Sequence, residues 1–394
     1  MVEVTRRDRM RLIQIVPQVP RQIEGVGAYA LRLAGALRTE FGIGSSFLVG
    51  DATWDQGPSP SVDKLDGVSA RSSEALVAGL EGLLRGDNGK GAAVLLHYVG
   101  YGYQKRGCPG WLLRGLTRWR RKGRRIPLVT VFHELYAFGP PWRSSFWLSP
   151  IQQVIARVVL RLSDAAITST GMYAARLRQW SSGQGREILR VPVFSSVGEP
   201  EYVSDAAERL PVMVVFGTPA RRARLYRRAA GSILIACRRL GLTELWDIGV
   251  PTETPWLGDG IKVVRMGQLP AEAVSRLLSM ARVGFIDLQP ASLGKSTVFA
   301  AYCAHGLMPV NGWPGSSLSD KLEDGYNLWA ADRVGDGGID LARITHIGRA
   351  ARAWYGEHAL SRQAGQYHAL IAGLAPPEAP GAAVGEGQSV PSRP

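Results

Sequence analysis

Short apolar runs alternate along the chain with longer segments whose apolar residues recur at helical spacing. In the first half this pattern predicts strands at 11–17, 47–50, 92–98, 127–132 and 165–168, and helices at 28–38, 73–84, 110–122, 150–162 and 171–180. The strand runs are continuously apolar or β-branched, which is typical of strands that are buried on both faces of a parallel sheet. The pattern therefore predicts an α/β fold.

The composition changes near residue 192, where a stretch rich in Pro, Ser and acidic residues indicates a linker. The alternation then restarts, with strands at 212–216, 245–248, 261–266, 283–288, 308–311 and 327–330, and helices at 223–240, 270–281, 296–305 and 339–370. We therefore expect two doubly wound, Rossmann-like domains, 1–195 and 211–350, joined by a linker at 196–210. Ligands of such sheets bind at the carboxyl ends of the strands, so two facing domains would form a cleft. The low-complexity tail, 374–394, is expected to be disordered.

Charge adds an expectation about ligands. The 394 residues include 47 Lys and Arg against 33 Asp and Glu, a net charge of +14. A protein this basic is expected to bind anions, whether nucleic acid, acidic lipid or phosphorylated small molecules. The spacing of the three cysteines fits neither a disulfide framework nor a zinc site, and neither a signal-peptide core nor a run of 18 apolar residues is present. These features predict a cytoplasmic protein, with a membrane surface as an open alternative.

Two features of the first half are candidate ligand contacts. Gly25 and Gly27 precede a helix, where small residues expose backbone N–H groups that suit a phosphate or sugar oxygen, although glycine also serves any tight turn. His97 ends one strand, and His133 with Glu134 ends another, which is where α/β sites are built, although a lone histidine is more often structural. The aromatic residues that follow fit a core, a sugar-stacking platform or a lipid-surface anchor: Tyr136, Phe138, Trp142 and Trp147.

The second half holds a candidate site for a diphosphate. A strand ends at Phe216, Gly217 makes a turn, and arginines open the following helix: Arg221, Arg222, Arg224, Arg227 and Arg228. Cations are unfavourable at a helix N-terminus, so Arg221, Arg222 or Arg224 make better sense beside a bound anion. The alternative, a solvated basic face, is expected for the last two arginines.

A second anion cradle is predicted later in the chain, in the run Gly294, Lys295, Ser296 and Thr297 between a strand and a helix. Backbone N–H groups, hydroxyls and the ammonium group would converge there on a helix N-terminus. The spacing is similar to the second half of a P-loop, but that motif requires Gly where this chain has Gln289. An NTPase is therefore disfavoured.

Several classes of site lack their signatures. No His, Asp and Glu cluster has metal-ligand spacing, and neither D-x-D nor G-x-S-x-G occurs. We therefore expect no metal, no other cofactor and no nucleophile elbow. Nucleic-acid binding through the net charge lacks any recognisable reading motif, so no nucleic-acid partner is expected.

Taken together, these features resemble the retaining GT-B glycosyltransferases of the "group 1", or family 4, type. The likeness rests on the tandem halves, the loop IEGVGAYALRLAGAL, the His-Glu pair after a middle strand and the run AAYCAHGLMPV, and it covers roughly residues 10–372. It implies that 1–195 holds the acceptor, that 211–350 holds a nucleotide-sugar donor, and that a last helix at 351–373 crosses back to the first domain. It also implies metal-independent transfer, with basic side chains neutralising the departing diphosphate.

Carried onto this chain, the resemblance places Gly25 and Gly27 near the donor phosphates and His133 beside the reacting sugar. We expect three residues to carry catalysis: His133, Arg224 and Lys295. The other candidates would bind substrate: Gly25, Gly27, His97, Glu134, Gly217, Arg221, Arg222, Gly294, Ser296 and Thr297. The E-x7-E motif of the family maps to Leu293 and Ala301, neither of which is acidic, so this chain departs from the pattern. Lys295 and the hydroxyls beside it would take over those contacts.

The implied function is sugar transfer to a saccharide or lipid-linked acceptor, in bacterial polysaccharide or glycolipid biosynthesis. The alternative is a degenerate GT-B protein that binds nucleotide-sugar or a partner without turnover; the missing acids favour it and the retained cations count against it. The basic segment 105–125, with interleaved Trp and Leu residues, would let the enzyme lie on an anionic membrane. The alternative for that segment is an ordinary surface helix whose apolar side lies in the core.

Overall fold

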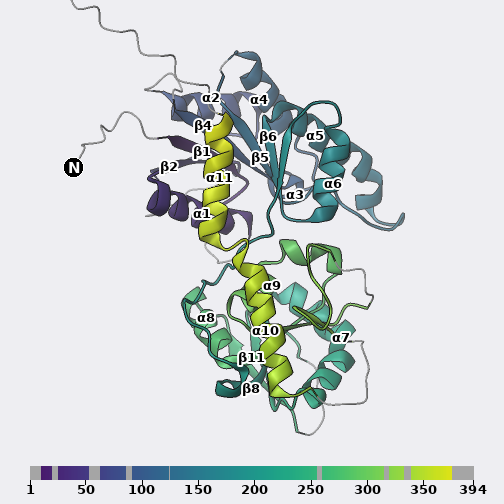
Figure 1. The fold of residues 1–394 in the computed structure, drawn as a ribbon. Coiled ribbons are helices and arrows are strands. Elements are labelled where there is room, and N and C mark those ends of the chain that lie inside the picture. Colours follow the sequence, from purple (N-terminus) through teal and green to yellow (C-terminus); the bar gives the residue numbers. More distant parts are fainter. Residues whose placement is uncertain are drawn as a thin grey trace, which may run out of the picture.

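The computed structural model describes residues 10–19, 25–52, 63–85, 91–123, 125–254, 260–314, 319–331 and 339–374. Within them the chain forms two all-parallel sheets, one in each of two domains that are stacked end to end in Figure 1. The expected α/β fold class, with two doubly wound halves, is confirmed.

The first domain is built on a sheet with strand order β3-β2-β1-β4-β5-β6-β7. Its strands are β1 (Arg11–Val16), β2 (Gly44–Val49), β3 (Lys64–Gly67), β4 (Ala92–Tyr98), β5 (Leu128–Phe132), β6 (Ala165–Thr168) and β7 (Glu187–Arg190). Its helices are α1 (Val26–Phe41), α2 (Ser73–Leu84), α3 (Gly100–Tyr103), α4 (Gly110–Arg121), α5 (Ser144–Leu162) and α6 (Gly171–Trp180). The pattern did not predict β3 and β7, because these two edge strands are short, carry charged residues and are only half-buried.

The second domain has strand order β10-β9-β8-β11-β12-β13. Its elements are η1 (Ala206–Glu208), β8 (Leu210–Phe216), α7 (Pro219–Arg239), β9 (Glu244–Ile248), β10 (Lys262–Gly267), α8 (Ala271–Met280), β11 (Ala281–Ile286), η2 (Pro290–Lys295), α9 (Thr297–Ala304), β12 (Met308–Asn311) and β13 (Trp329–Ala330). In both sheets the strand order reverses beside the first strand, between β1 and β4 and between β8 and β11. These are the switch points at which open α/β sheets bind ligands.

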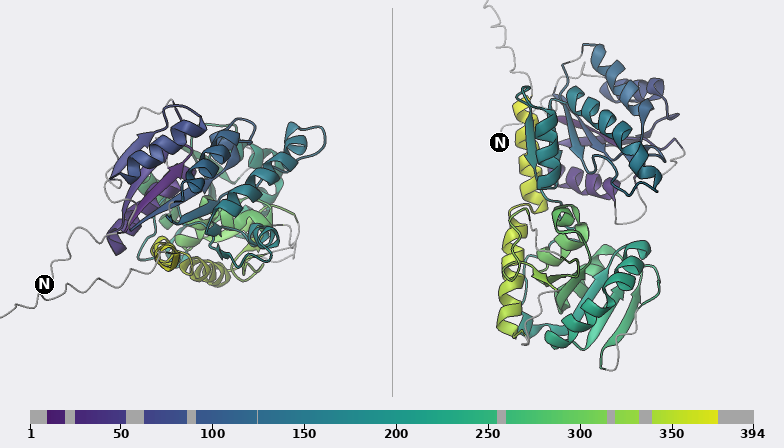
Figure 2. Two further views of the ribbon diagram at one scale, coloured as in Figure 1. Left: turned by 90° about the horizontal axis from the view of Figure 1, so that it is seen from above. Right: turned by 90° about the vertical axis from the view of Figure 1, so that its right-hand side faces the viewer.

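Two helices end the described chain, where one helix was expected to cross back at 351–373. α10 (Leu341–Gly356) packs on α9 and β12 of the second domain, and α11 (Leu360–Leu374) lies along α1 of the first. Figure 2 shows them running one after the other, in yellow, along one side of both domains. Beyond Leu374, the tail that was expected to be disordered lies outside the described residues.

The segment between β7 and β8 is not a solvated linker. Val191, Val193, Phe194 and Val197 are buried and belong to the same apolar cluster as residues of α1, α9 and α11. The acidic and proline-rich sequence there favoured an exposed connection. Its apolar side chains instead fill the seam between the domains.

The packing of α4 contradicts the hypothesis that segment 105–125 lies on a membrane. Trp111, Leu112, Leu116 and Trp119 are buried in the core of the first domain. Several of its basic residues are paired with acids from elsewhere, such as Arg120 with Asp164. The alternative interpretation, a surface helix with its apolar side in the core, therefore holds. Among the described helices, none has the length and apolar character needed to cross a bilayer.

Candidate functional site

The first sheet brings His97 and His133 together at its carboxyl edge. β4 and β5 are neighbouring parallel strands in which His97 pairs with Val131 and Tyr98 with Phe132. Since His133 directly follows β5, its ring lies beside that of His97, with ring centroids 5.4 Å apart and the planes nearly parallel. Neighbouring parallel strands end at the same edge, which is why the two histidines meet.

A hydrogen-bond chain orders the two rings. Gln14, in the middle of β1, accepts a hydrogen bond through Oε1 from His97 Nε2, at 2.8 Å, and donates through Nε2 to Ser45 Oγ, at 3.1 Å. A carbonyl oxygen can only accept, so the proton of His97 lies on Nε2 and its Nδ1 is an acceptor. His97 Nδ1 lies 3.1 Å from His133 Nε2, which must therefore donate. His133 is left with an unprotonated Nδ1, free to accept a hydrogen bond.

Both imidazoles are neutral near pH 7. Burial, reinforced by the neighbouring His133, holds the pKa of His97 well below its usual value. Only a small part of the His133 ring is exposed to solvent. The protein around the rest of the ring disfavours its charged form and lowers its pKa to about 4. The edge therefore offers a polar, uncharged acceptor and not a cation.

Tyr29 of α1 connects this pair to the end of the chain. Its ring stacks on Phe194 with centroids 4.3 Å apart and meets His133 edge-on at 5.2 Å. Its hydroxyl donates to Gln363 Oε1 at 2.9 Å and lies 3.0 Å from the Tyr367 hydroxyl, and both of these residues are on α11. The helix that returns from the second domain thus supports the wall behind the histidines.

The structure describes only part of the surroundings of the glycine loop and of Glu134. Gly25, with φ of 113°, is the N-cap residue of α1, and Gly27 is buried in the first turn of that helix. The segment before them, 20–24, lies outside the described residues. Glu134 follows His133 directly and is exposed. The binding roles of Gly25, Gly27 and Glu134 stay predictions.

The second sheet carries a cavity of about 720 Å³ at its carboxyl edge. Its walls come from the ends of β8, β9 and β10, the starts of α7 and α8, and two residues of the interdomain segment, Ser196 and Val197. Gly217, a predicted ligand contact, lines it, and so do the apolar Phe216 and Ile248. Its volume lies in the range of small-molecule sites.

Arg222 lies beneath this cavity and is not a free cation. Its guanidinium is 1% exposed, contacts both carboxylate oxygens of Asp247 at 2.5 Å and donates from Nε to the carbonyl of Gly217 at 3.0 Å. A Cβ on Gly249 would come within 2.9 Å of this guanidinium, which explains why glycine stands there with φ of 140°. The predicted role of Arg222 at a diphosphate is therefore replaced by a structural one, since Asp247 already neutralises its charge.

The other two predicted arginines of α7 are exposed. Arg221 and Arg224 point out of the helix, one and two residues from the buried Arg222. Arg224 acts together with Arg228 on Asp287, a buried carboxylate directly after β11. Burial raises the pKa of Asp287, and the charges of Arg228 and Arg224 oppose the rise. Both cations therefore gather at the carboxyl end of β11, at the switch point of this sheet.

The predicted second cradle is an interdomain contact. Residues 290–295 form the 3-10 helix η2, not a phosphate loop, and Gly294 accepts a hydrogen bond from Val193 N–H at 2.8 Å. Ser296 is buried and caps α9 by accepting from Phe299 N–H at 3.2 Å, while Thr297, the first residue of α9, is half-buried. Lys295 donates to the Tyr173 hydroxyl of the first domain at 3.2 Å. Its ammonium group thus lies at the seam.

The positions of the E-x7-E motif are apolar core. Leu293 and Ala301 are fully buried, so neither position presents a side chain to a ligand. Among the residues that the structure describes, no group of three or more His, Cys, Asp and Glu side chains is arranged to hold a metal ion.

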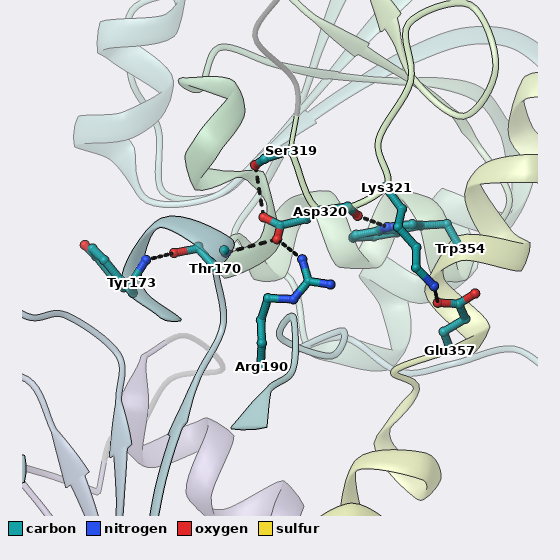
Figure 3. A network of polar contacts seen from close by, with 9 residues as sticks. Thr170, Tyr173, Arg190, Ser319, Asp320, Lys321, Trp354 and Glu357 are labelled. Carbon is teal, nitrogen blue, oxygen red and sulfur yellow. Dashed lines mark hydrogen bonds and ion pairs between the residues drawn. The ribbon is translucent and has the colours of Figure 1, made fainter. Parts of the chain in front are cut away.

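A buried carboxylate joins the domains beside η2. Asp320 accepts hydrogen bonds from Gly171 N–H at 3.0 Å, at the start of α6, and from Arg190 at the end of β7 (Figure 3). On its other side its carbonyl accepts from Trp354 Nε1 at 2.8 Å. Lys321, the next residue, pairs with Glu357 at the surface. An anion at the N-terminus of α6 is favoured by the helix dipole, and here the other domain supplies it.

Sequence reasoning missed four residues of these two edges: Gln14, Tyr29, Glu272 and Asp287. Gln14 had a usable signal, because a polar residue in the middle of a continuously apolar strand needs a buried partner. Asp287 had another, since it directly follows a buried strand. Glu272, which lines the cavity from the first turn of α8, looked like any acidic residue at a helix start.

The comparisons with known proteins identify the architecture. No protein-family model and no curated protein matches this sequence. Solved structures do match: an alpha,alpha-trehalose 6-phosphate synthase from Burkholderia multivorans has TM-score 0.60 at 13% identity, over 93% of this chain and 97% of that one. A glycosyltransferase from Rickettsia africae has TM-score 0.56 at 9% identity, over 93% and 99% of the two chains.

A third similar structure is an alpha-glucosyltransferase in complex with UDP-glucose and DNA containing an abasic site. It has TM-score 0.55 at 12% identity and covers 92% of this chain and 100% of that one. At such identities the likeness shows the fold, which is the GT-B arrangement of two Rossmann-like domains. The expected GT-B fold is confirmed, while the family 4 type stays a prediction.

Proposed function

We propose that the protein is a glycosyltransferase that moves a sugar from a nucleotide-diphosphate sugar to a saccharide or lipid-linked acceptor. The observation that carries this proposal is the cavity of about 720 Å³ at the carboxyl ends of β8, β9 and β10, beside the seam of a GT-B fold. Apolar walls suit a nucleobase, and Glu272 supplies a carboxylate that can accept hydrogen bonds from ribose hydroxyls. The UDP-glucose complex of a structure with the same fold supports a nucleotide-sugar donor.

Breaking the anomeric bond places negative charge on the departing diphosphate. Cations and helix N-termini held in place before the reaction stabilise that charge as it develops. In this proposal Arg221 and Arg224, exposed on the first turns of α7, provide the cations, and Lys295 adds a third at the seam. No divalent metal takes part.

In this proposal His133 orients the donor sugar and does not act as a general acid. A neutral ring whose Nε2–H is engaged with His97 offers Nδ1 as an acceptor, which would orient a hydroxyl of the donor sugar. Transfer with retention of configuration, a cytoplasmic location and a place in bacterial polysaccharide or glycolipid assembly follow from the resemblance to family 4 and complete the proposal.

A second candidate function is binding of nucleotide-sugar without turnover. It is favoured by one observation, the apolar burial of Leu293 and Ala301, where the family carries acids. The exposed arginines count against it, because exposed cations at a helix start are retained at a cost in dipole energy.

Thermal shift against a panel of nucleoside diphosphates and nucleotide-sugars tests both functions. A ligand at about 100 times its Kd stabilises the folded protein by about 2.7 kcal/mol. A shift with one nucleotide followed by product formation, detected by mass spectrometry with an acceptor panel, supports the transferase. A shift without hydrolysis or transfer supports the binding protein, and no shift with any nucleotide contradicts both.

Arg224→Ala and Lys295→Ala test the proposed cations, with Arg227→Ala as the matched control on the exposed face of α7. Removing a group that stabilises developing charge lowers kcat by about 10²–10³-fold. We expect this loss for Arg224→Ala, a smaller loss for Lys295→Ala, and wild-type rates for Arg227→Ala. Unchanged hydrolysis and transfer in both variants would end the assignment.

A further inference from the structure

An unusual apolar surface lies on α5 and the loop that leads into it. The described residues expose 16 large apolar side chains, and six of them fall within 17 residues of sequence. We call these six the aromatic surface: Phe138, Trp142, Phe146, Trp147, Ile151 and Val154. Trp142 is 83% exposed and Trp147 is 70% exposed, so neither indole contributes to the core. Figure 1 shows α5 on the side of the first domain away from α11.

Helical spacing places part of this surface on one face of α5. Trp147, Ile151 and Val154 follow one another at intervals of four and three residues, and the opposite face, with Ala156 and Leu160, is buried in the core. The apolar character of the exposed face is therefore not needed for folding. An exposed apolar patch of this kind marks an interaction site.

The loop is held against the helix, so the six side chains form one surface. Trp147 donates through Nε1 to the carbonyl of Pro141 at 2.8 Å, and its ring meets that of Phe146 edge-on at 5.4 Å. Gln152, on the buried side of α5, accepts from Ala137 N–H at 2.8 Å. The aromatic rings are thereby presented outward on a fixed frame.

The charge around this surface has one sign. From residue 135 to residue 163 the chain carries three arginines and no acidic residue. Arg157 and Arg161 continue the exposed face of α5 beyond Val154, and Arg143 lies in the loop; all three are exposed. The exposed face of α5 thus passes from apolar to basic along its length.

We propose that the aromatic surface docks on an anionic lipid bilayer. Tryptophan and phenylalanine side chains on an outward face insert at the level of the headgroups, and arginines beside them attract acidic lipids. The loop that carries Phe138 and Trp142 begins directly after His133 and Glu134, so docking would bring the carboxyl edge of the first sheet to the membrane. The inference does not depend on sugar transfer, and its test is independent of activity.

Co-sedimentation with vesicles of phosphatidylcholine, with and without about 30% phosphatidylglycerol, tests the docking directly. We expect the wild-type protein to sediment with the anionic vesicles, to sediment little with phosphatidylcholine alone, and to bind less when salt rises from about 0.1 M to about 0.5 M. Equal binding to both vesicles, or no binding to either, would overturn the proposal.

The variant Trp142→Ser/Trp147→Ser should lower the partition coefficient about tenfold for each indole removed, since burial of one aromatic side chain is worth about one decade of binding. The matched control is Tyr202→Ser/Met280→Ser, which removes two exposed apolar side chains from outside the first sheet and its helices and should bind like the wild type. Arg157→Gln/Arg161→Gln should lower binding about fivefold per arginine. Its control is Arg227→Gln/Arg238→Gln on α7.

Two measurements separate this proposal from its rivals. The melting temperature of the double tryptophan variant without ligand should equal that of the wild type, which shows an intact fold, and the shift with nucleotide, measured separately, keeps failure of docking distinct from failure of donor binding. Sedimentation velocity without lipid should show no dimer. A dimer that the double tryptophan variant abolishes would mean that a second copy covers the surface, and would overturn the proposal.

Discussion

The carboxyl edges of the two sheets are built on opposite principles. At the first edge, neutral buried groups satisfy one another: the chain from Ser45 through Gln14 and His97 to His133 contains no formal charge. At the second edge, charge is separated by depth. Arg222 and Asp247 neutralise each other under the cavity, while Arg221 and Arg224 of the same helix remain exposed.

Under the proposed function, this difference would give the two edges different parts of the reactants to hold. A neutral, hydrogen-bonded wall with low histidine pKa values can orient hydroxyl groups but cannot hold an anion. An open edge with exposed cations can hold an anion, because its buried charges are already compensated. An acceptor and a sugar ring suit the first edge, and a diphosphate suits the second.

Of the substitutions proposed here, Arg222→Ala should lower the free energy of unfolding the most. It leaves the Asp247 carboxylate buried without its partner, which costs about 3–5 kcal/mol. Arg221→Ala, one residue away and exposed, should change the free energy of unfolding by less than about 0.5 kcal/mol. Urea unfolding of both variants measures the contrast, and equal effects would contradict the assignment of Arg222 to the core.

Lowering the pH tests whether the buried histidines, including His133 at the first edge, are held neutral. Burial lowers the pKa of His133, His305 and His358 to about 4, so the folded protein binds fewer protons than the unfolded chain below the ordinary histidine pKa. Their stabilisation is present above about pH 6.5 and is lost as the pH falls towards 4. We expect the free energy of unfolding to drop by about 1 kcal/mol per histidine between pH 6.5 and 5.5.

The control for this pH dependence is His133→Gln, which should remove one histidine's share of the slope. Asp287, whose pKa is raised by burial, acts in the opposite sense and cannot produce the drop. A free energy of unfolding that stays constant from pH 6.5 to 5.5 would show that the histidines are not held neutral.

Asp320→Asn tests the contact by which Asp320 of the second domain binds the first domain. The amide keeps the shape and tolerates the left-handed backbone, with φ of 62°, but it loses the charge that accepts from Arg190 and from the N-terminus of α6. We expect a loss of about 2 kcal/mol, the value of a charged hydrogen bond. Lys321→Gln, at the neighbouring exposed pair, should cost less than about 1 kcal/mol. Calorimetric unfolding distinguishes the two.

Tyr29→Phe should lower the free energy of unfolding the least of these variants, and it tests the contact between the first edge and α11. It removes the hydroxyl that donates to Gln363 and leaves that acceptor buried, at a cost of about 1 kcal/mol. Tyr202→Phe, at an exposed tyrosine, should leave the midpoint of chemical unfolding unchanged. If the two variants unfold alike, the hydroxyl does not tie α11 to α1.

Two helices of the first domain, α4 and α5, show a limit of sequence reasoning. Both α4 and α5 contain tryptophan and arginine, and the sequence left a membrane-facing role open for α4 while slightly favouring a surface helix with its apolar side in the core. In the fold Trp119 is 1% exposed and Trp147 is 70% exposed. Periodicity gives the angle between residues around a helix axis, but it does not say which side the rest of the domain will cover.

The elements were predictable to a useful degree. Strand β4 and helix α2 have the predicted bounds, and the edge position of His97 and His133 followed from the rule that parallel strands end together. The partners of those residues were not predictable. Gln14 reaches His97 across 83 positions, and Tyr29 reaches Gln363 across 334, and no local pattern encodes such pairs.

The sequence by itself determined two parallel sheets, their helices and the carboxyl edges where polar residues gather, because alternation and periodicity are local consequences of which residues avoid water. Only the tertiary structure decided that Arg222 is paired under the cavity while Arg224 is exposed, and that Gly294 docks the domains together. Such outcomes depend on contacts between distant segments. The free energy of a charge or a carbonyl is set by the groups that finally surround it.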